Sequence, residues 1–391
     1  MDKVVIVMPT YKEKDNIERM ITELFEKEFP KIRNVSMHLL VVNDLPSDGG
    51  PDDGTGDIVK KYAKKFDNLH IIEDKKQGLG WAYVRGMKYA MERLHADAVM
   101  EMDADFQHPP RFVAPMVAAY LDGADYAIGS RYIKGGSVPK EWAMHRKAVS
   151  FFGNLFIRIA LVKPKIHDLT TGFRLTRVKG VLDKIKLNEL MELSRFAYKV
   201  DLLYQSIKNS KKVVEVPLEF APRTEEVSKF SMQEMVSTFK VAIILGIKDK
   251  QRFIKYGAVG LIGYAINAVG LEVFYRLGFS TGVAAAIGAE FAIVSNFILN
   301  NFWTFKEEKI TSLAKVVSKF VQFNLSSVGA VVIQAIVVAV GTGIFGVGTR
   351  QIMLIIAVGF FVIPYNYAMY NLFIWKTWKV PALEKIQKLL G

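Results

Sequence analysis

The charged residues are distributed very unevenly along this chain, and that division limits the architectures it can adopt. Residues 1–250 contain 40 Lys and Arg with 34 Asp and Glu, whereas residues 251–391 contain only 12 and 5. Long stretches this poor in charge are typical of membrane-spanning helices, each of which needs about 20 predominantly apolar residues. The sequence therefore predicts a soluble N-terminal part followed by a membrane part, and it excludes a purely soluble protein.

Four apolar runs in the second part have the length of a span: residues 256–275, 281–303, 320–347 and 351–375. Twelve Lys and Arg residues flank the start of the first run, the connection between the second and third, and the end of the fourth. Only Arg276 and Arg350 lie in the other two connections. Because cytoplasmic flanks are rich in Lys and Arg, we expect a multi-pass membrane protein whose N-terminal domain and C-terminus are cytoplasmic.

Composition narrows the function further. The chain has no cysteine, which excludes disulfides, Cys-ligated metal sites and thiol catalysis. Much of the net charge of +13 lies beside the predicted spans, so anionic lipid headgroups, rather than nucleic acid, are the expected counter-charge.

The soluble part alternates short β-branched runs with amphipathic helical patterns. Strands are expected near residues 4–8, 37–42, 69–73, 98–102 and 125–129, with helical spacing of apolar residues between them. Such alternation predicts an α/β fold with a mostly parallel sheet flanked by helices on both faces. Ligands of such sheets bind beyond the C-terminal ends of the strands, so the residues that follow each strand are the candidates for a site.

Carboxylates and amides gather at these strand ends. Asp103, Asp105 and Gln107 follow one strand directly, and oxygen ligands of this kind suit Mg²⁺ or Mn²⁺ together with substrate phosphates. Gly78 and Gly80 follow the wrong strand for a dinucleotide-binding fingerprint and lack its third glycine, so dinucleotide binding is rejected.

Several of these segments together carry a family resemblance. The runs VMPTYKE (7–13), VVND (41–44), MDADFQHPP (102–110), GSRY (129–132) and DLTTGFR (168–174) resemble the family-2 glycosyltransferases of the dolichyl-phosphate mannose synthase type, the polyprenyl-phosphate hexose synthases. The apolar tail, with NNFWTF at residues 300–305, is similar to the GtrA-like transmembrane domain fused to some of these enzymes. The resemblance covers nearly the whole chain and implies a GT-A-type sheet plus an all-α domain of four transmembrane helices.

The resemblance also implies a role for each matching residue. The catalytic residues would be Asp103, Asp105, Arg223 and Lys229. The nucleotide-sugar donor would meet Pro9, Tyr11, Glu13, Val42, Asp44, Asp103, Ala104, Arg223 and Lys229. A divalent ion, Mg²⁺ or Mn²⁺, would bind Asp105 and Gln107, and the acceptor phosphate would meet Arg131, Arg146 and Ser150.

One segment departs from the family pattern. The family usually has two aspartates where this chain has Asn43 and Asp44, and a lengthened glycine- and aspartate-rich loop follows at residues 47–56. The departure concerns the nucleoside contacts, and hence the choice of base, but leaves the metal site intact.

The implied reaction is inverting, metal-dependent transfer of a hexose to a polyprenyl or dolichyl monophosphate at the cytoplasmic membrane face, with mannose from GDP-mannose favoured. One alternative keeps the chemistry and uses UDP-glucose. A further alternative is a lipid-linked sugar flippase or binding protein whose soluble domain senses nucleotide.

The expected domains are a cytoplasmic GT-A-type domain over residues 1–229, interfacial helices and linker over 230–252, the transmembrane domain over 253–379 and a cytoplasmic tail over 380–391. Residues 145–162 and 230–245 combine large apolar residues with Lys or Arg, a pattern typical of amphipathic helices that lie at the membrane interface.

Overall fold

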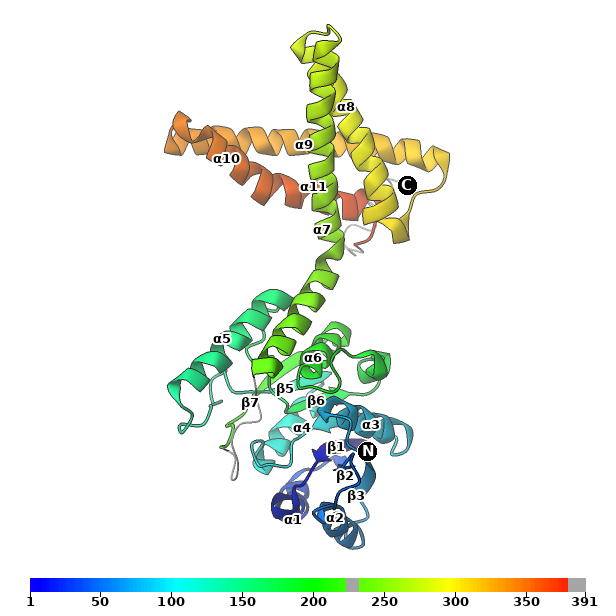
Figure 1. Ribbon diagram of the computed structural model, residues 1–391, viewed down its shortest axis with the longest axis vertical. Helices are drawn as coiled ribbons and strands as arrows, with labels where there is room; N and C mark the ends of the chain where they lie inside the picture. Colours follow the sequence, from blue (N-terminus) through cyan, green and yellow to red (C-terminus); the bar gives the residue numbers. More distant parts are fainter. Residues whose placement is uncertain (223–231, 379–391) are drawn as a thin grey trace. The chain divides into compact units, whose positions relative to one another are not determined.

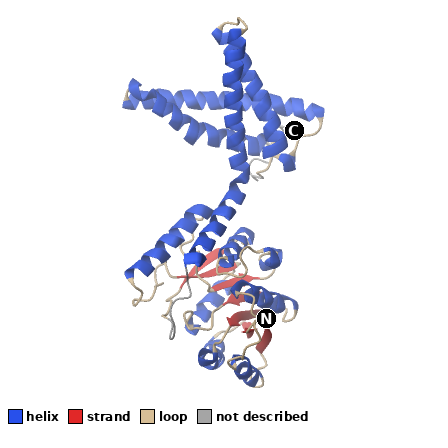
Figure 2. Ribbon diagram, in the orientation of Figure 1, coloured by secondary structure: helices blue, strands red, loops and turns tan. Residues whose placement is uncertain are grey.

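The structure is a computed structural model, which describes residues 1–222 and 232–378. The chain forms two compact units, Met1–Lys248 and Asp249–Gly391. The first unit contains the strands, and the regular elements described in the second unit are all helices (Figure 2).

The first unit is built on a seven-stranded sheet of order β3-β2-β1-β4-β6-β5-β7. Strand β6 is antiparallel to both of its neighbours, and the other pairs are parallel. The mostly parallel α/β sheet expected from the sequence is therefore confirmed. The strands are β1 (Asp2–Thr10), β2 (Val35–Leu45), β3 (Leu69–Lys75), β4 (Ala98–Glu101), β5 (Tyr126–Ser130), β6 (Arg174–Arg177) and β7 (Val213–Pro217).

Helices connect the strands and cover the sheet (Figure 1). Those within the first unit are α1 (Lys14–Thr22), α2 (Thr55–Ala63), α3 (Leu79–Glu92), α4 (Val113–Leu121), α5 (Met144–Leu161) and α6 (Tyr198–Asn209). Helix α7 (Met232–Arg276) is continuous from the first unit into the second, which continues with α8 (Thr281–Leu299), α9 (Leu313–Phe345), α10 (Arg350–Ile356) and α11 (Ile363–Met369).

Strand β1 lies inside the sheet between β2 and β4, and its burial explains its continuously apolar sequence. Val4, Ile6 and Met8 are buried in the core on one face of the sheet, whereas Val5 and Val7 are buried in the core on the other. Successive side chains of a strand point to opposite faces, so a strand covered on both sides needs apolar residues at every position.

Helix α5 packs against the first turns of α7 in the first unit (Figure 1). The rings of Phe156 and Phe239 lie 4.6 Å apart, and Ile157 and Val241 are buried in the same cluster. Large apolar side chains on the other faces of the two helices remain exposed: Val149, Phe151, Phe152, Ile159, Met232, Val236 and Ile243.

Three helical segments in the described part of the chain are long and apolar enough to cross a membrane: Met232–Arg276, Leu313–Phe345 and Ala357–Ile374. The first segment contains the first predicted span, and the other two overlap the third and fourth. The second predicted span coincides with α8 and the π-helical turn Asn300–Thr304 that follows it. Four crossings therefore remain a prediction.

The run of asparagines and aromatic residues after α8, Asn300–Phe305, has a structural role. Asn301 accepts hydrogen bonds from the Trp375 indole (3.1 Å) and from the backbone of Ile310 (2.8 Å). The Trp375 ring stacks on Phe305 with a centroid separation of 4.3 Å. These contacts join the end of α8 to the last described helix of the bundle.

Candidate active site

The fold brings the predicted nucleotide residues to one edge of the sheet. Pro9 and Val42 are direct partners in the β1–β2 register, and Thr10 is paired with Asn43 one step further. Tyr11 and Glu13 follow β1 at the same edge. The backbone N–H of Glu13 donates to Thr55 Oγ1 at 3.1 Å, which connects this edge to the start of α2.

Asp44 lies on β2 and forms an ion pair with Arg85 of α3. Burial raises the pKa of Asp44 to about 6, and Arg85 opposes that rise. The Arg85 Nε lies 3.6 Å from Asp74 of β3, so two carboxylates from neighbouring strands share one guanidinium. Asp44, Arg85 and Asp74 therefore form a charged cluster where the sequence predicts nucleoside contacts, and Asp44 and Arg85 are its more buried members.

Asn43, the departure from the family pattern, points away from that cluster. Its Oδ1 accepts a hydrogen bond from Thr10 (3.0 Å), and its Nδ2 donates to Glu73 Oε1 (3.3 Å). Neighbouring residues of a strand face opposite sides, which explains why Asn43 meets Glu73 while Asp44 meets Arg85. An amide is suited to this position because it can donate to a carboxylate.

The lengthened loop is fastened to the start of α1. Asp53 accepts hydrogen bonds from the backbone N–H groups of Lys14 and Thr55, both at 3.0 Å, and from the Thr55 hydroxyl at 2.7 Å. Burial by itself would raise the pKa of Asp53, but these bonds outweigh it and hold the pKa below its usual value. The loop is therefore tied beside the predicted nucleoside residues.

A substitution tests this account of the β2 end. We expect Asn43→Asp to lower the free energy of unfolding by about 1–3 kcal/mol, because it removes the donor to Glu73 and leaves a buried carboxylate facing a second carboxylate. Thermal or chemical unfolding of the full chain in detergent measures the change. Adding Glu73→Gln should restore much of the loss, and the exposed control Asn188→Asp should change little. Equal stability of Asn43→Asp and wild type would contradict the account.

The segment after β4 makes a tight turn that gathers the carboxylates. Phe106 has a positive φ of 60°, which is uncommon for a residue with a side chain, and the backbone N–H of Gln107 donates to Asp105 Oδ1 at 3.2 Å. The Arg19 guanidinium covers the Phe106 ring at 4.5 Å. The turn thus holds Asp105 and Gln107 together, as the metal prediction requires.

The oxygen atoms of Asp105 and Gln107 suit a hard divalent cation. Among the described residues, no group of three or more His, Cys, Asp and Glu side chains could hold a metal. A site with two protein ligands fits Mg²⁺ or Mn²⁺, which complete their coordination with water and substrate phosphates. The donor chemistry therefore fits the expected cofactor.

Asp103 is held by groups on three elements. The Tyr83 hydroxyl of α3 donates to its Oδ1 at 2.7 Å, and the Lys199 ammonium of α6 lies 3.6 Å from its Oδ2. Its backbone N–H donates to Nδ1 of His108 at 3.1 Å. Burial lowers the pKa of His108 to about 4, so this ring is neutral and accepts that bond.

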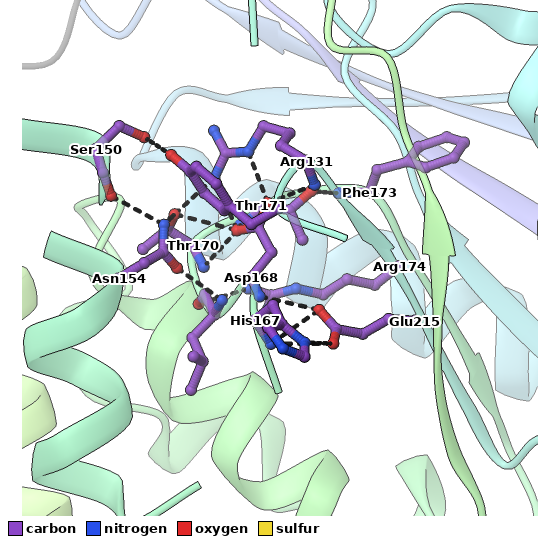
Figure 3. Close-up of polar contacts among 12 residues, drawn as sticks. Arg131, Ser150, Asn154, His167, Asp168, Thr170, Thr171, Phe173, Arg174 and Glu215 are labelled. Carbon is purple, nitrogen blue, oxygen red and sulfur yellow. Dashed lines mark hydrogen bonds and ion pairs between the residues drawn. The ribbon is translucent and has the colours of Figure 1, made fainter. Parts of the chain in front are cut away.

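Arg131, predicted to meet the acceptor phosphate, is buried and paired with Asp168 (Figure 3). Its Nε and Nη2 donate to the two oxygens of Asp168 at 2.7 and 2.8 Å. Asp168 also accepts backbone N–H groups of Arg131, Thr170 and Thr171. Burial would raise the pKa of Asp168, but Arg131 and these N–H groups hold it below its usual value.

Ser150 belongs to the same polar network (Figure 3). Its hydroxyl lies 2.5 Å from the Tyr132 hydroxyl, and Asn154 connects Ser150 to Thr170 by hydrogen bonds of 3.1 and 2.9 Å. Thr170 accepts in turn from Arg131 at 2.7 Å. Arg146 lies one helical turn before Ser150 on α5, with its guanidinium 4.0 Å from the Trp142 ring centre.

Two predicted residues, Arg223 and Lys229, lie outside the described residues. Conversely, the sequence interpretation gave no role to Tyr83, Lys199 or Asp168. Asp168 stands in the DLTTGFR run, so it was visible, whereas Lys199 lies in no motif. Its only signal is its place among the mostly apolar residues at the start of α6.

Comparison with known proteins identifies the class. Residues 5–183 match the model of glycosyl transferase family 2, and residues 255–375 match that of the GtrA/DPMS transmembrane domain. These two matches define a glycosyltransferase with a membrane domain. A dolichol-phosphate mannosyltransferase of Pyrococcus furiosus is 31% identical over 340 residues, covering 86% of this chain and 89% of that protein. The chain belongs to the family-2 glycosyltransferases that carry the GtrA/DPMS transmembrane domain.

Two further relatives match the soluble part. A polyprenol monophosphomannose synthase of Mycolicibacterium smegmatis is 35% identical over 243 residues, covering 61% of this chain and 86% of that protein. An undecaprenyl-phosphate mannosyltransferase of Micrococcus luteus is 32% identical over 230 residues, covering 59% and 88%. Among solved structures, a glucosyl-3-phosphoglycerate synthase of Mycobacterium tuberculosis with Mn²⁺, UDP-glucose and phosphoglyceric acid aligns with a TM-score of 0.43 at 15% identity, covering 63% of this chain and 79% of that one.

Proposed function

We propose that this glycosyltransferase transfers mannose from GDP-mannose to a polyprenyl monophosphate at the cytoplasmic face of the membrane. The proposal is supported by the names of its relatives, by the oxygen ligands at the end of β4, and by the place of the acceptor residues. The last observation carries it. Arg146 and Ser150 lie on α5, a helix that also exposes Phe152 and Ile159, 62% and 67% accessible. A lipid with a phosphate head needs such a pairing of polar site and apolar surface.

The reaction is a displacement at the anomeric carbon of the sugar. An oxygen of the polyprenyl phosphate forms the new bond as the bond to the GDP diphosphate breaks, so the configuration inverts and GDP leaves. The attacking oxygen is already anionic near neutral pH, which makes a strong general base unnecessary. Asp103 would orient the donor, and Arg223 and Lys229 would supply positive charge to the departing diphosphate.

The metal proposal rests on Asp105 and Gln107. Bound there, Mg²⁺ or Mn²⁺ would act as a Lewis acid for the negative charge that develops on the diphosphate. Both side chains follow β4, at the sheet edge that Pro9 and Val42 share, so phosphate and nucleoside contacts belong to one donor site.

The membrane topology follows the distribution of cations. Four crossings, with both the catalytic domain and the C-terminus in the cytoplasm, place the twelve flanking Lys and Arg residues on the cytoplasmic side. The exposed apolar faces of α5 and the first turns of α7 would then rest in the headgroup region as interfacial helices.

The direct test measures lipid-extractable radiolabel after incubating the purified full chain with a polyprenyl phosphate, Mg²⁺ or Mn²⁺, and labelled GDP-mannose or UDP-glucose. Metal-dependent label from GDP-mannose is expected. Label only from UDP-glucose would replace the sugar and keep the chemistry. No label from either donor, with nucleotide binding intact, would overturn the proposal in favour of a lipid-linked sugar flippase or binding protein.

The acceptor assignment predicts a selective defect. We expect Arg146→Ala to raise the KM for polyprenyl phosphate about 10- to 100-fold, the worth of a hydrogen bond to a charged group, while leaving the KM for the donor unchanged. Initial rates at varied acceptor and donor concentrations separate the two constants. The neighbouring Lys147→Ala, whose Nζ donates to the backbone of Lys140, is the matched control. A rise in donor KM instead would place Arg146 at the donor site.

A further inference from the structure

The buried lysine of α6 is the feature of the site that the motifs do not explain. Lys199 is almost completely buried, yet its Nζ forms no hydrogen bond to any described residue. Two aromatic rings flank it, Tyr83 at 5.4 Å and Phe196 at 4.9 Å from the ring centres. Burying an ammonium costs several kcal/mol unless a counter-charge is close. The nearest carboxylate oxygen in an ion pair with it is Oδ2 of Asp103, at 3.6 Å.

Asp103 is accordingly held on both oxygens. Tyr83 donates to Oδ1 and Lys199 faces Oδ2, so a hydroxyl from α3 and a cation from α6 together set the plane of the carboxylate. The side chain of Asp103 is still 30% accessible, whereas that of Lys199 is 1% accessible. The carboxylate is therefore partly accessible, whereas the lysine that faces it is buried.

A glycine of the DLTTGFR run makes room for this lysine. A Cβ atom at position 172 would collide with the Nζ of Lys199. Gly172 does not have the left-handed backbone conformation that would itself favour glycine. Glycine is thus required at position 172 to leave space for the Lys199 ammonium. Through Lys199, the DLTTGFR run is connected to the Asp103 carboxylate.

We propose that Lys199 is a positioning residue that holds the Asp103 carboxylate in its productive orientation toward the sugar donor. The inference rests on the proposed transfer reaction and adds a residue to that site. A purely structural role for Lys199, as counter-charge to the buried Glu101, is the competing explanation. The two differ in whether the effect of Lys199 depends on Asp103.

The test is a double-mutant cycle on the full chain. We expect Lys199→Met, which keeps the length but removes the charge, to lower kcat up to about 100-fold, as misplacement of a reacting group does, with the donor KM near that of wild type. In an Asp103→Asn background the same substitution should have little further effect on kcat. Lys208→Met, an exposed lysine of the same helix, is the matched control and should retain wild-type kcat.

A second variant moves the ammonium without deleting it. Gly172→Ala should displace the flexible end of Lys199 from Asp103 and lower kcat. That loss should disappear when Lys199 is already Met. If Lys199→Met fails to fold, Gly172→Ala in wild-type and Asp103→Asn chains decides the question.

The outcomes are distinct. Wild-type kcat in Lys199→Met, or losses that multiply independently with Asp103→Asn, would overturn the positioning role and leave the proposed reaction intact. An unimpaired Asp103→Asn enzyme would overturn it as well. Failure of the wild-type chain to transfer any sugar would refute the proposed function itself, before the variants are compared.

Discussion

Asp105→Ala should abolish most metal-dependent transfer, lowering kcat by about 10²–10³-fold or more. The expected size follows from the loss of a preorganised charge at the point where the diphosphate becomes more negative. Asp105 and Gln107 share one tight turn after β4, so removal of the carboxylate leaves the amide as the remaining predicted protein ligand. Label transfer from GDP-mannose to polyprenyl phosphate, titrated with Mg²⁺ and Mn²⁺, measures the effect.

The control for this prediction is Asp67→Ala, which removes an exposed aspartate from a turn far along the chain from the motif. Chelation of metal from the wild-type enzyme should reproduce the Asp105→Ala defect, and added metal should reverse the chelation alone. Undiminished metal-dependent transfer by Asp105→Ala would remove Asp105 from the metal site.

Asp168→Ala should destabilise the N-terminal unit by about 3–5 kcal/mol, the cost of leaving a buried cation without its partner. The carboxylate accepts two side-chain bonds from Arg131 and three from backbone N–H groups, and these five bonds would be lost together. Chemical unfolding of the full chain in detergent measures the loss. Replacing Arg131 by Met in the same chain should recover part of it.

An exposed ion pair supplies the matched control. Arg111 and Glu219 lie 2.8 Å apart with both side chains more than half accessible, so Glu219→Ala should cost at most about 1 kcal/mol. A loss for Asp168→Ala no larger than that of Glu219→Ala would show that the charge of Arg131 is compensated elsewhere.

The pH dependence of the stabilisation by Asp168 has a definite sign. The lowered pKa of Asp168 means that its stabilisation is complete above the usual carboxyl pKa of 3.8 and is lost as the pH falls below it.

The structure changes how the acceptor residues are understood. Arg131 appears in the family motif as a phosphate ligand, but its guanidinium is occupied by Asp168 and Thr170. Its charge is largely compensated, which makes Arg146 the stronger candidate for direct contact with the phosphate. Arg131 would then shape the pocket by holding residues 168–171 against α5, a role that motif matching does not distinguish from binding.

The sequence by itself determined the division into a soluble and a membrane part. Charged side chains are costly inside a bilayer, so the membrane part can be recognised by its low content of Lys, Arg, Asp and Glu. It also determined the mostly parallel sheet, since strands such as Val4–Met8 are apolar at every position. Asp105 and Gln107 could likewise be proposed as metal ligands from the sequence alone, because they are neighbours along one turn of the chain.

Only the tertiary structure decided which groups support those residues. Lys199 reaches Asp103 from a helix 96 positions further along the chain, and Asn43 on β2 pairs with Glu73 on the neighbouring strand β3. Asp168 reaches Arg131 from a separate loop 37 residues away. Periodicity and short motifs report what is close along the chain, whereas a buried charge is balanced by whatever the fold brings within a few ångströms. For that reason candidate ligands can be proposed from the sequence, whereas the groups that hold them in place come only from the fold.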